Sequence, residues 1–226
     1  MAKQTTREKI LDAAEILFAE KGFSTTSVRE ITRKAGVNLA ALNYHFGSKA
    51  GLIEAVFKRR IDPINRDRLE MLRKFEAEAQ DKPLSLEKIL EAFLLPAFRM
   101  SDESQPARIF INLMGRIHME ASSLDSGNEE INRTKNNIMM NFKDVFIIFS
   151  GMLAKALPGV SREELFWRLS FTLGSMAHTM MLVHGKHSNP VTEALSALER
   201  SEPLSPGNQD KVLSYLVRYT AAGLRG

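Results

Sequence analysis

The sequence predicts an all-α protein with two parts: a small helical domain over residues 1–60 and a larger helical domain over residues 61–226. Apolar residues recur at helical spacing along most of the chain, and no alternating run is long enough to favour a strand. The two parts differ in their balance of charged residues. Residues 1–60 hold 11 Lys+Arg against 6 Asp+Glu, whereas residues 61–226 hold 20 against 21. The basic surplus indicates an anionic partner for the first part alone.

The first two helices of the small domain are predicted from their caps. Thr5 and Glu8 have the spacing of a capping box, an apolar face follows, and Gly22 ends the pattern. Ser27 and Glu30 repeat that spacing at the start of a second, short helix. Two amphipathic helices are therefore expected, over residues 5–20 and from residue 27 onward.

The next two helices follow directly. Gly36 ends the second helix, and Asn38 is placed to cap a third helix of about two turns that reaches Phe46. Ser48 is placed to cap a fourth helix, whose apolar side we expect to pack on the others. Phe46 itself is expected in the core, because it continues the apolar face.

Longer helical patterns make up the rest of the chain. The character of the sequence changes after Asp62-Pro63, and a helix over residues 162–184 and a final amphipathic helix over residues 212–219 are the clearest elements. Charged, polar, Gly or Pro-containing stretches predict breaks. They lie at residues 81–83, 101–106, 122–128, 158–159 and 186–208.

Two short helices joined by the corner 35–37 form a predicted helix-turn-helix. Gly36 suits the corner because glycine adopts a positive φ without steric cost, and Val37 is expected to pack back between the helices. In such a motif the second helix enters the major groove of DNA. Basic side chains nearby strengthen this interpretation: Arg29, Arg33, Lys34 and Lys49. Arg33 and Lys34 have a plainer alternative as a solvated helix face.

The segment 10–57 resembles the DNA-binding domain of TetR-family transcriptional regulators. The resemblance is carried by "ILDAAEILFAEKGFSTTSVREIT", the corner "KAGV" and "LNYHFGSKAGLIEAVF". It implies a homodimer that binds double-stranded DNA at a pseudo-palindromic operator, and a C-terminal domain that binds a small effector. The implied function is a ligand-responsive regulator, with repression as the expected mode and no cofactor.

Position by position, the resemblance places the helix that reads DNA at residues 38–45. Leu39, Ala40 and Ala41 near its start would face base edges through methyl contacts and groove shape. Asn43 is the side chain there that can hydrogen-bond a base. Asn38 completes the predicted contact surface at the helix start.

Phosphate contacts are expected around this helix. Tyr44 and His45 would contact the backbone, as would Thr26 or Ser27 together with Arg29. Lys49 and the free amides at the start of the fourth helix form a natural phosphate site. Tyr44 packing beside the corner and His45 as an ordinary surface residue remain alternatives.

A hydrophobic effector is predicted for the larger domain. Met1 aside, all ten methionines lie beyond residue 60, as do nine of the thirteen phenylalanines, and methionine suits adaptable apolar cavities. Helical spacing of such residues is also what an ordinary core requires. The segments "LAALNYHFGSKAGLIEAVF" and "ELFWRLSFTLG" resemble the PsrA-type branch of the family, which implies a long-chain fatty acid or acyl-CoA.

That branch resemblance implies a binding site with two kinds of side chain. Arg116 or Arg168 would pair with a carboxylate head group, and an intramolecular ion pair is the alternative for each arginine. The acyl chain would lie along Phe110, Met114, Trp167 and Phe171.

Dimerisation is predicted from the last two helices. The helix over residues 162–184 is apolar almost all round after Arg168, so it needs cover on two sides. With the final amphipathic helix it would form a four-helix interface between subunits. The absence of cysteine fits a reducing cytoplasm. The charge-free run 169–185 is too short for a convincing membrane span, and we find no secretory signal.

The sequence fits three other functions less well. An enzyme or metal protein is disfavoured, since His184 and His187 lie three apart without a matching carboxylate, and no nucleophile or phosphate-loop motif occurs. An architectural DNA-binding protein would spread basic residues over the whole chain. A regulator whose larger domain senses a protein partner keeps the helix-turn-helix and remains the nearest alternative.

Overall fold

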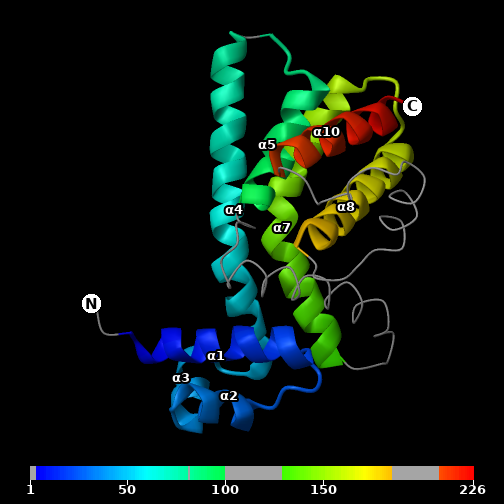
Figure 1. Ribbon diagram of the computed structural model, residues 1–226. Coiled ribbons are helices and arrows are strands. Elements are labelled where there is room, and N and C mark those ends of the chain that lie inside the picture. The colour runs from blue at the N-terminus through cyan, green and yellow to red at the C-terminus, as the bar shows by residue number, and fades with distance from the viewer. Residues whose placement is uncertain (1–3, 81, 100–128, 185–208) are drawn as a thin grey trace, which may run out of the picture. The chain divides into compact units, whose positions relative to one another are not determined.

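The computed structural model describes residues 4–80, 82–99, 129–184 and 209–226, and all regular structure within them is helical. The predicted all-α class is confirmed (Figure 1). The helices are α1 (Thr6–Lys21), α2 (Val28–Ala35), α3 (Leu39–Phe46), α4 (Lys49–Ala79), α5 (Leu86–Arg99), α7 (Glu129–Ala156), α8 (Arg162–His184) and α10 (Gln209–Arg225).

The N-terminal caps form as their spacing predicts. The Thr5 hydroxyl accepts a hydrogen bond from the Glu8 amide, and the Glu8 carboxylate accepts one from the Thr5 amide at 2.8 Å. Ser27 and Glu30 make the same reciprocal pair at the start of α2. Each box satisfies amides that have no partner inside the helix, so both helix starts are fixed locally.

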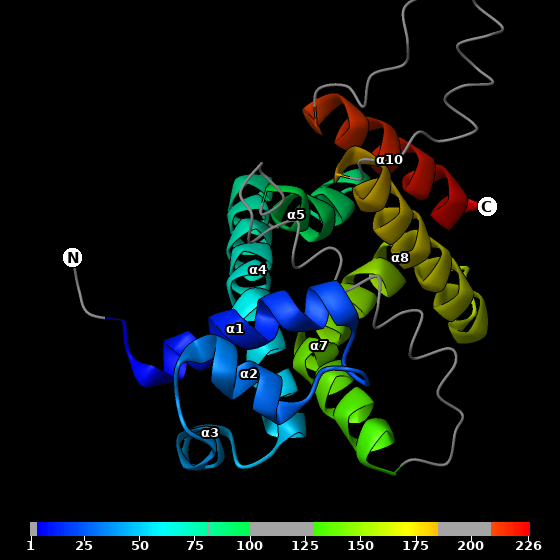
Figure 2. The ribbon, with the colours of Figure 1, turned by 60° about the horizontal axis from the view of Figure 1, so that its bottom comes forward.

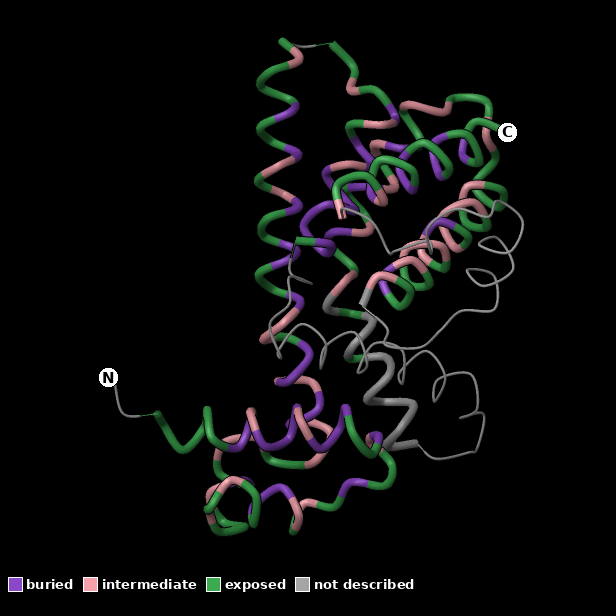
Figure 3. Tube along the Cα trace, in the orientation of Figure 1, coloured by how far each residue is buried: buried purple, intermediate pink, exposed green. Residues whose placement is uncertain are grey.

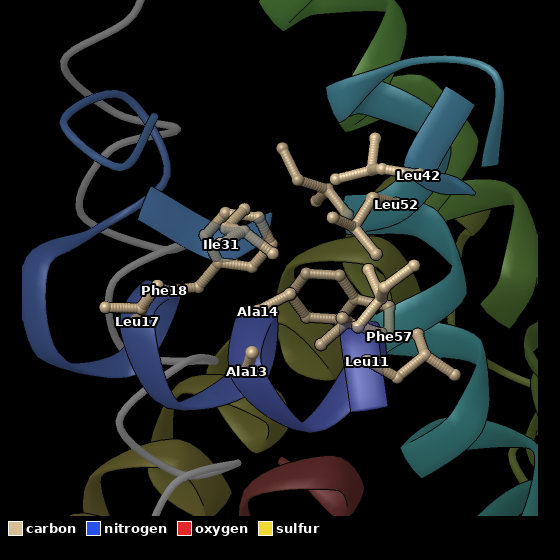
Figure 4. Close-up of a cluster of buried hydrophobic side chains, with 12 residues drawn as sticks. Leu11, Ala13, Ala14, Leu17, Phe18, Ile31, Leu42, Leu52 and Phe57 are labelled. Atoms are coloured by element: carbon tan, nitrogen blue, oxygen red, sulfur yellow. The ribbon is translucent and has the colours of Figure 1, made fainter. Parts of the chain in front are cut away.

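One apolar core joins α1 to α4 (Figure 4). Phe18 and Phe57 are fully buried, and Phe23 lies between them with ring centroids 5.0 and 5.8 Å away. Figure 3 shows buried positions recurring between exposed ones along α1, as an amphipathic helix requires. The remaining buried members are Ile10, Leu11, Ala13, Ala14, Leu17, Ile31, Leu42, Leu52, Ile53 and Val56.

Helix α4 passes the expected domain boundary without a break. Pro63 lies inside it, and the helix continues to Ala79. The described residues nevertheless fall into two compact units. The first unit takes the residues up to Asn65 and those from 129 to Phe146. The second takes the described residues of 66–99 and those from Ile147 onward. The change of composition near Pro63 therefore marks where α4 leaves the first unit, and a division at residue 60 remains a prediction.

The second unit is built around α10, which packs against both α5 and α8 (Figures 1 and 2). Its core includes an arginine: the Arg68 Nε donates to the Phe93 carbonyl at 2.8 Å, and its guanidinium lies 4.1 Å from the Phe93 ring centroid. Burial lowers the pKa of Arg68 to about 10. The predicted break at 158–159 and the helix over 162–184 are confirmed. The breaks at 101–106, 122–128 and 186–208 lie outside the described residues.

Candidate nucleic-acid interface

The corner between α2 and α3 has the geometry of a helix-turn-helix. Gly36 adopts φ 65° and ψ 36°, the left-handed conformation in which a side chain would be strained. The amides of Gly36 and Val37 donate to the carbonyls of Arg33 and Thr32, which closes the end of α2. Helix α1 contacts both helices of the motif, and Figure 2 shows it next to α2.

One side of helix α3 packs in the core, and the other side faces solvent. Leu42 is fully buried in the core, whereas Leu39, Ala40, Asn43 and Tyr44 are exposed. The exposed positions share one face because they are separated by three or four residues. Leu39 is 48% exposed and Tyr44 is 86% exposed, so both large side chains are accessible to a partner. Ala41 is half-buried beside this face.

The residue just before the motif's second helix, Asn38, has a local role. The Asn38 side-chain oxygen accepts a hydrogen bond from the Ala41 amide at 2.8 Å, so it caps α3. Asn38 itself is exposed. Its amide nitrogen is therefore the part of that side chain that can face a nucleic acid, because the oxygen is engaged.

The aromatic run after Asn43 divides between surface and core. The Tyr44 ring stands edge-on to the His45 ring, with centroids 5.2 Å apart. Phe46 is partly buried and packs on the core, as expected, and the Arg7 guanidinium lies 5.4 Å from its ring centroid. His45 is half-buried and lines an open hollow of about 480 Å³ together with Arg7 and Lys58.

The start of α4 follows α3 closely. The Ser48 hydroxyl accepts a hydrogen bond from the Gly51 amide at 3.1 Å, which confirms Ser48 as the cap. The Ser48 amide donates to the Phe46 carbonyl at 2.8 Å, so the end of α3 and the start of α4 are held together. Lys49 is half-buried at the first position of α4, where the helix dipole also attracts anions.

Thr26 has a different role from the predicted phosphate contact. It is 0% exposed, and its hydroxyl donates to the Gly22 carbonyl at 2.7 Å and lies 3.3 Å from the Leu17 carbonyl. The expectation for Thr26 is therefore wrong, because a buried hydroxyl that closes the end of α1 cannot reach a phosphate. Ser27 is exposed, but its hydroxyl donates to Glu30 within the capping box. Arg29 is exposed on α2.

Glu30 links the first two helices. The Lys21 ammonium donates to the Glu30 Oε1 at 2.7 Å, while Glu30 Oε2 accepts from the Ser27 amide and hydroxyl. The hydrogen bond from Lys21, followed by those from Ser27, lowers the pKa of Glu30 from 4.5 to about 2. Lys21 is therefore engaged with a carboxylate, and its charge does not add to the surface of α2.

Two further cations of the basic surplus are also engaged, which the sequence did not reveal. Arg59 and Arg60 of α4 both donate to the carboxylate of Glu15 on α1, and Arg59 also donates to Asp12 at 2.6 Å. Glu15 is 2% exposed. A signal existed in the spacing: Asp12 and Glu15 lie three apart, hence on one face of α1, and that face could have been matched to α4.

The predicted effector residues have mixed outcomes. Phe110, Met114 and Arg116 lie outside the described residues. The Arg168 guanidinium donates to the Glu164 carboxylate at 2.5 Å and to the Leu224 carbonyl at the end of α10. Arg168 is therefore an intramolecular ion-pair partner, the alternative given above, and caps α10, while its pairing with a head group stays a prediction.

Trp167 and Phe171 lie on the outside of α8. They are 52% and 66% exposed, with ring centroids 6.2 Å apart, and Phe166 adds a third exposed ring 5.4 Å from Trp167. Both rings are exposed rather than enclosed, and their contact with an acyl chain stays a prediction. The three residues Phe166, Trp167 and Phe171 are called the α8 aromatic patch below.

The described residues contain neither a metal-binding cluster nor a membrane-spanning helix. No group of three or more His, Asp or Glu side chains lies close enough to hold a metal ion. Nor does the described part of the chain contain a helix that combines the length and the apolar character needed to span a membrane.

Comparison with known families decides the assignment. Residues 10–56 match the family described as bacterial regulatory proteins, tetR family, and residues 91–223 match the tetracyclin repressor-like C-terminal domain. The second match alone covers more than half of the chain. The chain belongs to the TetR family. The match at residues 10–56 contains the corner and α3, so the family's DNA-binding segment coincides with the exposed helix described above.

Individual relatives agree with this family. The HTH-type transcriptional regulator AcrR of Shigella flexneri is 31% identical over 111 residues, which is 49% of this chain and 48% of AcrR. The HTH-type transcriptional repressor KstR2 of Rhodococcus jostii is 32% identical over 105 residues, 46% of this chain and 48% of KstR2. The chain thus matches about half the length of these curated relatives. All are regulators, and they carry the helix-turn-helix in their names.

A solved structure shows the same fold over the whole chain. The fatty acid degradation regulator FadR from Bacillus halodurans superposes with a TM-score of 0.55 at 14% identity, covering 100% of this chain and 99% of FadR. Together with the family match, this confirms a helix-turn-helix domain followed by a larger helical domain as the fold of this TetR-family chain.

Proposed function

We propose that the protein is a cytoplasmic TetR-family repressor that binds a pseudo-palindromic operator as a homodimer and releases it on binding a hydrophobic effector. The exposed face of α3 carries the DNA-binding part of this proposal. Leu39, Ala40 and Asn43 face water on a helix whose opposite side is anchored by Leu42. A surface of small and apolar side chains favours contact with thymine methyls and groove shape, with Asn43 as the hydrogen-bonding residue.

Backbone contacts in this proposal come from both sides of α3. Tyr44 extends from the end of the helix, and Arg29 stands on α2. Lys49 and the amides at the start of α4 supply a third contact, because the hydrogen bond from Ser48 to Phe46 keeps that helix start beside α3. His45 contacts the backbone from the rim of the hollow. Contacts of this kind fix register without reading sequence, so α3 alone carries specificity.

The proposed dimer forms through α8 and α10. The α8 aromatic patch places three exposed rings on one surface, and such a surface is costly unless another molecule covers it. Tyr215 and Tyr219 of α10 are also exposed. A second copy is the partner of choice, because an operator with two half-sites requires two reading helices related by a two-fold axis.

The proposed effector is a hydrophobic molecule such as a long-chain fatty acid or acyl-CoA. Support comes from the methionine- and phenylalanine-rich sequence beyond residue 60 and from the fatty acid degradation regulator that shares the fold. Phe110, Met114 and Arg116 are proposed to contact it. Ligand acts by favouring a dimer state whose reading helices no longer match successive major grooves, to the extent of its differential affinity for the two states.

Selection of genomic fragments by the purified protein, followed by sequencing, tests this function. The experiment is done at near-physiological salt, and Tyr44→Ala with Asn43→Ala serves as a binding-deficient control. Enrichment of one pseudo-palindrome by the wild type is expected. Fragments without a shared site, bound with an affinity that collapses as salt rises, would instead indicate an architectural DNA-binding protein.

A further inference from the structure

A buried cluster of charges connects α1 to α4 within the first unit. The Arg60 Nε donates to Glu15 Oε1 at 2.6 Å and its Nη2 to Oε2 at 3.1 Å, so this contact is bidentate. The Arg59 Nη2 donates to the same Oε2, and its Nη1 donates to Asp12 Oδ1 at 2.6 Å. We call these four residues, Asp12, Glu15, Arg59 and Arg60, the α1–α4 clamp.

The clamp is an unusual way to hold two helices that already share an apolar core. Leu11, Ala14 and Phe57 are each at most 1% exposed, so burial of apolar surface supplies adhesion between α1 and α4. Burying Glu15 and half-burying two guanidiniums carries a desolvation cost that ion pairing only roughly offsets. Apolar side chains of similar volume would hold the helices equally well, so adhesion does not explain the clamp.

The clamp restricts the direction of α4 relative to α1. Hydrogen bonds from a planar guanidinium to a carboxylate have narrow geometry, whereas apolar contacts tolerate sliding. Arg60 lies eleven residues after Lys49, which is about 16 Å along the helix at 1.5 Å per residue. The start of α4 is held at α3 by Ser48, and the clamp holds α4 a second time, further along. Two fixed points define the line of α4 relative to α1.

The direction of α4 affects the position of the reading helix α3. Helix α1 contacts both α2 and α3, so an α4 fixed to α1 is also fixed to α3. Helix α4 then continues without a break past Asn65 into the second unit, which carries the surface proposed for dimerisation. A tilt of about 10° over roughly 20 Å moves the end of a helix by about 3.5 Å, which is about the rise of one base pair.

We propose that Glu15 is a positioning residue for operator binding: through Arg59 and Arg60 it sets the direction of α4 relative to α3 and so the half-site spacing that the dimer accepts. This inference rests on the proposed function as a dimeric operator-binding protein. It also assigns Arg59 and Arg60 no contact with phosphate, although they belong to the basic surplus of residues 1–60. Glu15 touches no base in this account and acts only through the two arginines.

The test compares three labelled duplexes by fluorescence anisotropy. One carries the pseudo-palindrome selected from the genome, and the other two have its centre lengthened or shortened by one base pair. Glu15→Gln is the test variant, because glutamine keeps the shape and removes the charge. Glu78→Gln is the matched control, since Glu78 also faces a cation, Lys74, but across 3.9 Å on an exposed part of α4.

Wild type and Glu78→Gln are expected to prefer the selected spacing by at least about tenfold. Glu15→Gln is expected to reduce that preference to about threefold or less, with the dependence of affinity on salt unchanged because no phosphate contact is lost. A structural defect alone would lower the affinity of the protein for all three duplexes equally. Equal weakening, or a preference that stays at the wild-type value, overturns the role of Glu15.

Folding and the underlying function are controlled separately. Circular dichroism checks that Glu15→Gln is folded, and if it is not, Arg60→Lys takes its place, because lysine keeps the charge and loses the bidentate fork. The same loss of spacing preference is then expected, and its absence overturns the proposal. If the wild type itself fails to distinguish the three duplexes, the proposed operator function is contradicted. If the wild type distinguishes them and the variant distinguishes them equally well, only the role of Glu15 is contradicted.

Discussion

Truncating Phe171 tests the proposed dimer through the α8 aromatic patch. Phe171 is 66% exposed, which corresponds to roughly 130 Å² of a side chain that buries about 200 Å² when fully enclosed. At about 25 cal/mol per Å², covering it by a second copy contributes up to about 3 kcal/mol. Alanine retains part of this area, so Phe171→Ala loses about 2 kcal/mol per subunit. A two-fold interface contains the residue twice, and the dimer is therefore weakened by about 4 kcal/mol, or roughly a thousandfold in Kd.

Sedimentation velocity across a dilution series measures this change. Tyr44→Ala is the matched control, because Tyr44 is an aromatic residue of even higher exposure on a surface assigned to DNA. We expect Phe171→Ala to dissociate at concentrations where the wild type is dimeric, and Tyr44→Ala to remain dimeric while losing affinity for DNA. A Phe171→Ala protein whose dimer Kd matches the wild type would refute the use of this surface.

Three further changes test the first unit. Asn38→Ala removes the cap of α3 and is expected to lower the free energy of unfolding by about 1 kcal/mol in urea denaturation. The pKa of Glu30 is about 2 when folded and near 4.5 when unfolded, so its stabilisation is complete above about pH 4.5 and is lost as the pH falls toward 2. Glu30→Gln should flatten the dependence of the melting temperature on pH in that window, and an unaltered slope would show that the Lys21 contact is not what stabilises it. Lys49→Gln should weaken binding to every duplex similarly and lower the slope of log K against log salt by about one; an unchanged slope would remove Lys49 from the phosphate contacts.

Sequence reasoning worked where structure is decided by neighbours in the chain. The caps at Thr5, Ser27 and Asn38 and the left-handed Gly36 all depend on residues within four positions, and each formed as predicted. The exposed face of α3 was predicted from the family resemblance rather than from these local signals. The helix break at 158–159 was also local, since proline and glycine oppose helix continuation there.

The failures came from contacts between distant residues. Thr26 was predicted as a phosphate contact from the resemblance, but the fold buries its hydroxyl against the end of α1. Arg59 and Arg60 were included in the basic surplus predicted to face an anionic partner. In the structure both donate hydrogen bonds to Glu15, which lies more than forty positions away in the sequence. Helix α8 is apolar on so many sides that periodicity could not say which side faces inward, and the exposure of Trp167 was therefore not predicted.

The boundary near Pro63 illustrates a third kind of limit. Proline removes one hydrogen bond from a helix and usually ends or kinks it, but α4 continues to Ala79 because neighbouring contacts outweigh that loss. Buried residues on both sides of Pro63, Ile61 and Ile64, supply such contacts. The change of composition indicated where the chain leaves the first unit and enters the second. It could not show that a single helix spans this boundary.

The central claim is that two copies of α3 read one operator from successive major grooves. Hydroxyl-radical footprinting of the wild-type protein on the selected duplex, with methylation interference at guanine N7, tests it most directly. The account predicts two protected patches on one face of the DNA, separated by one helical turn of about 34–36 Å or a whole multiple of it, with interference in the major groove of each half-site. A single patch, or uniform protection along the duplex without major-groove interference, would contradict it.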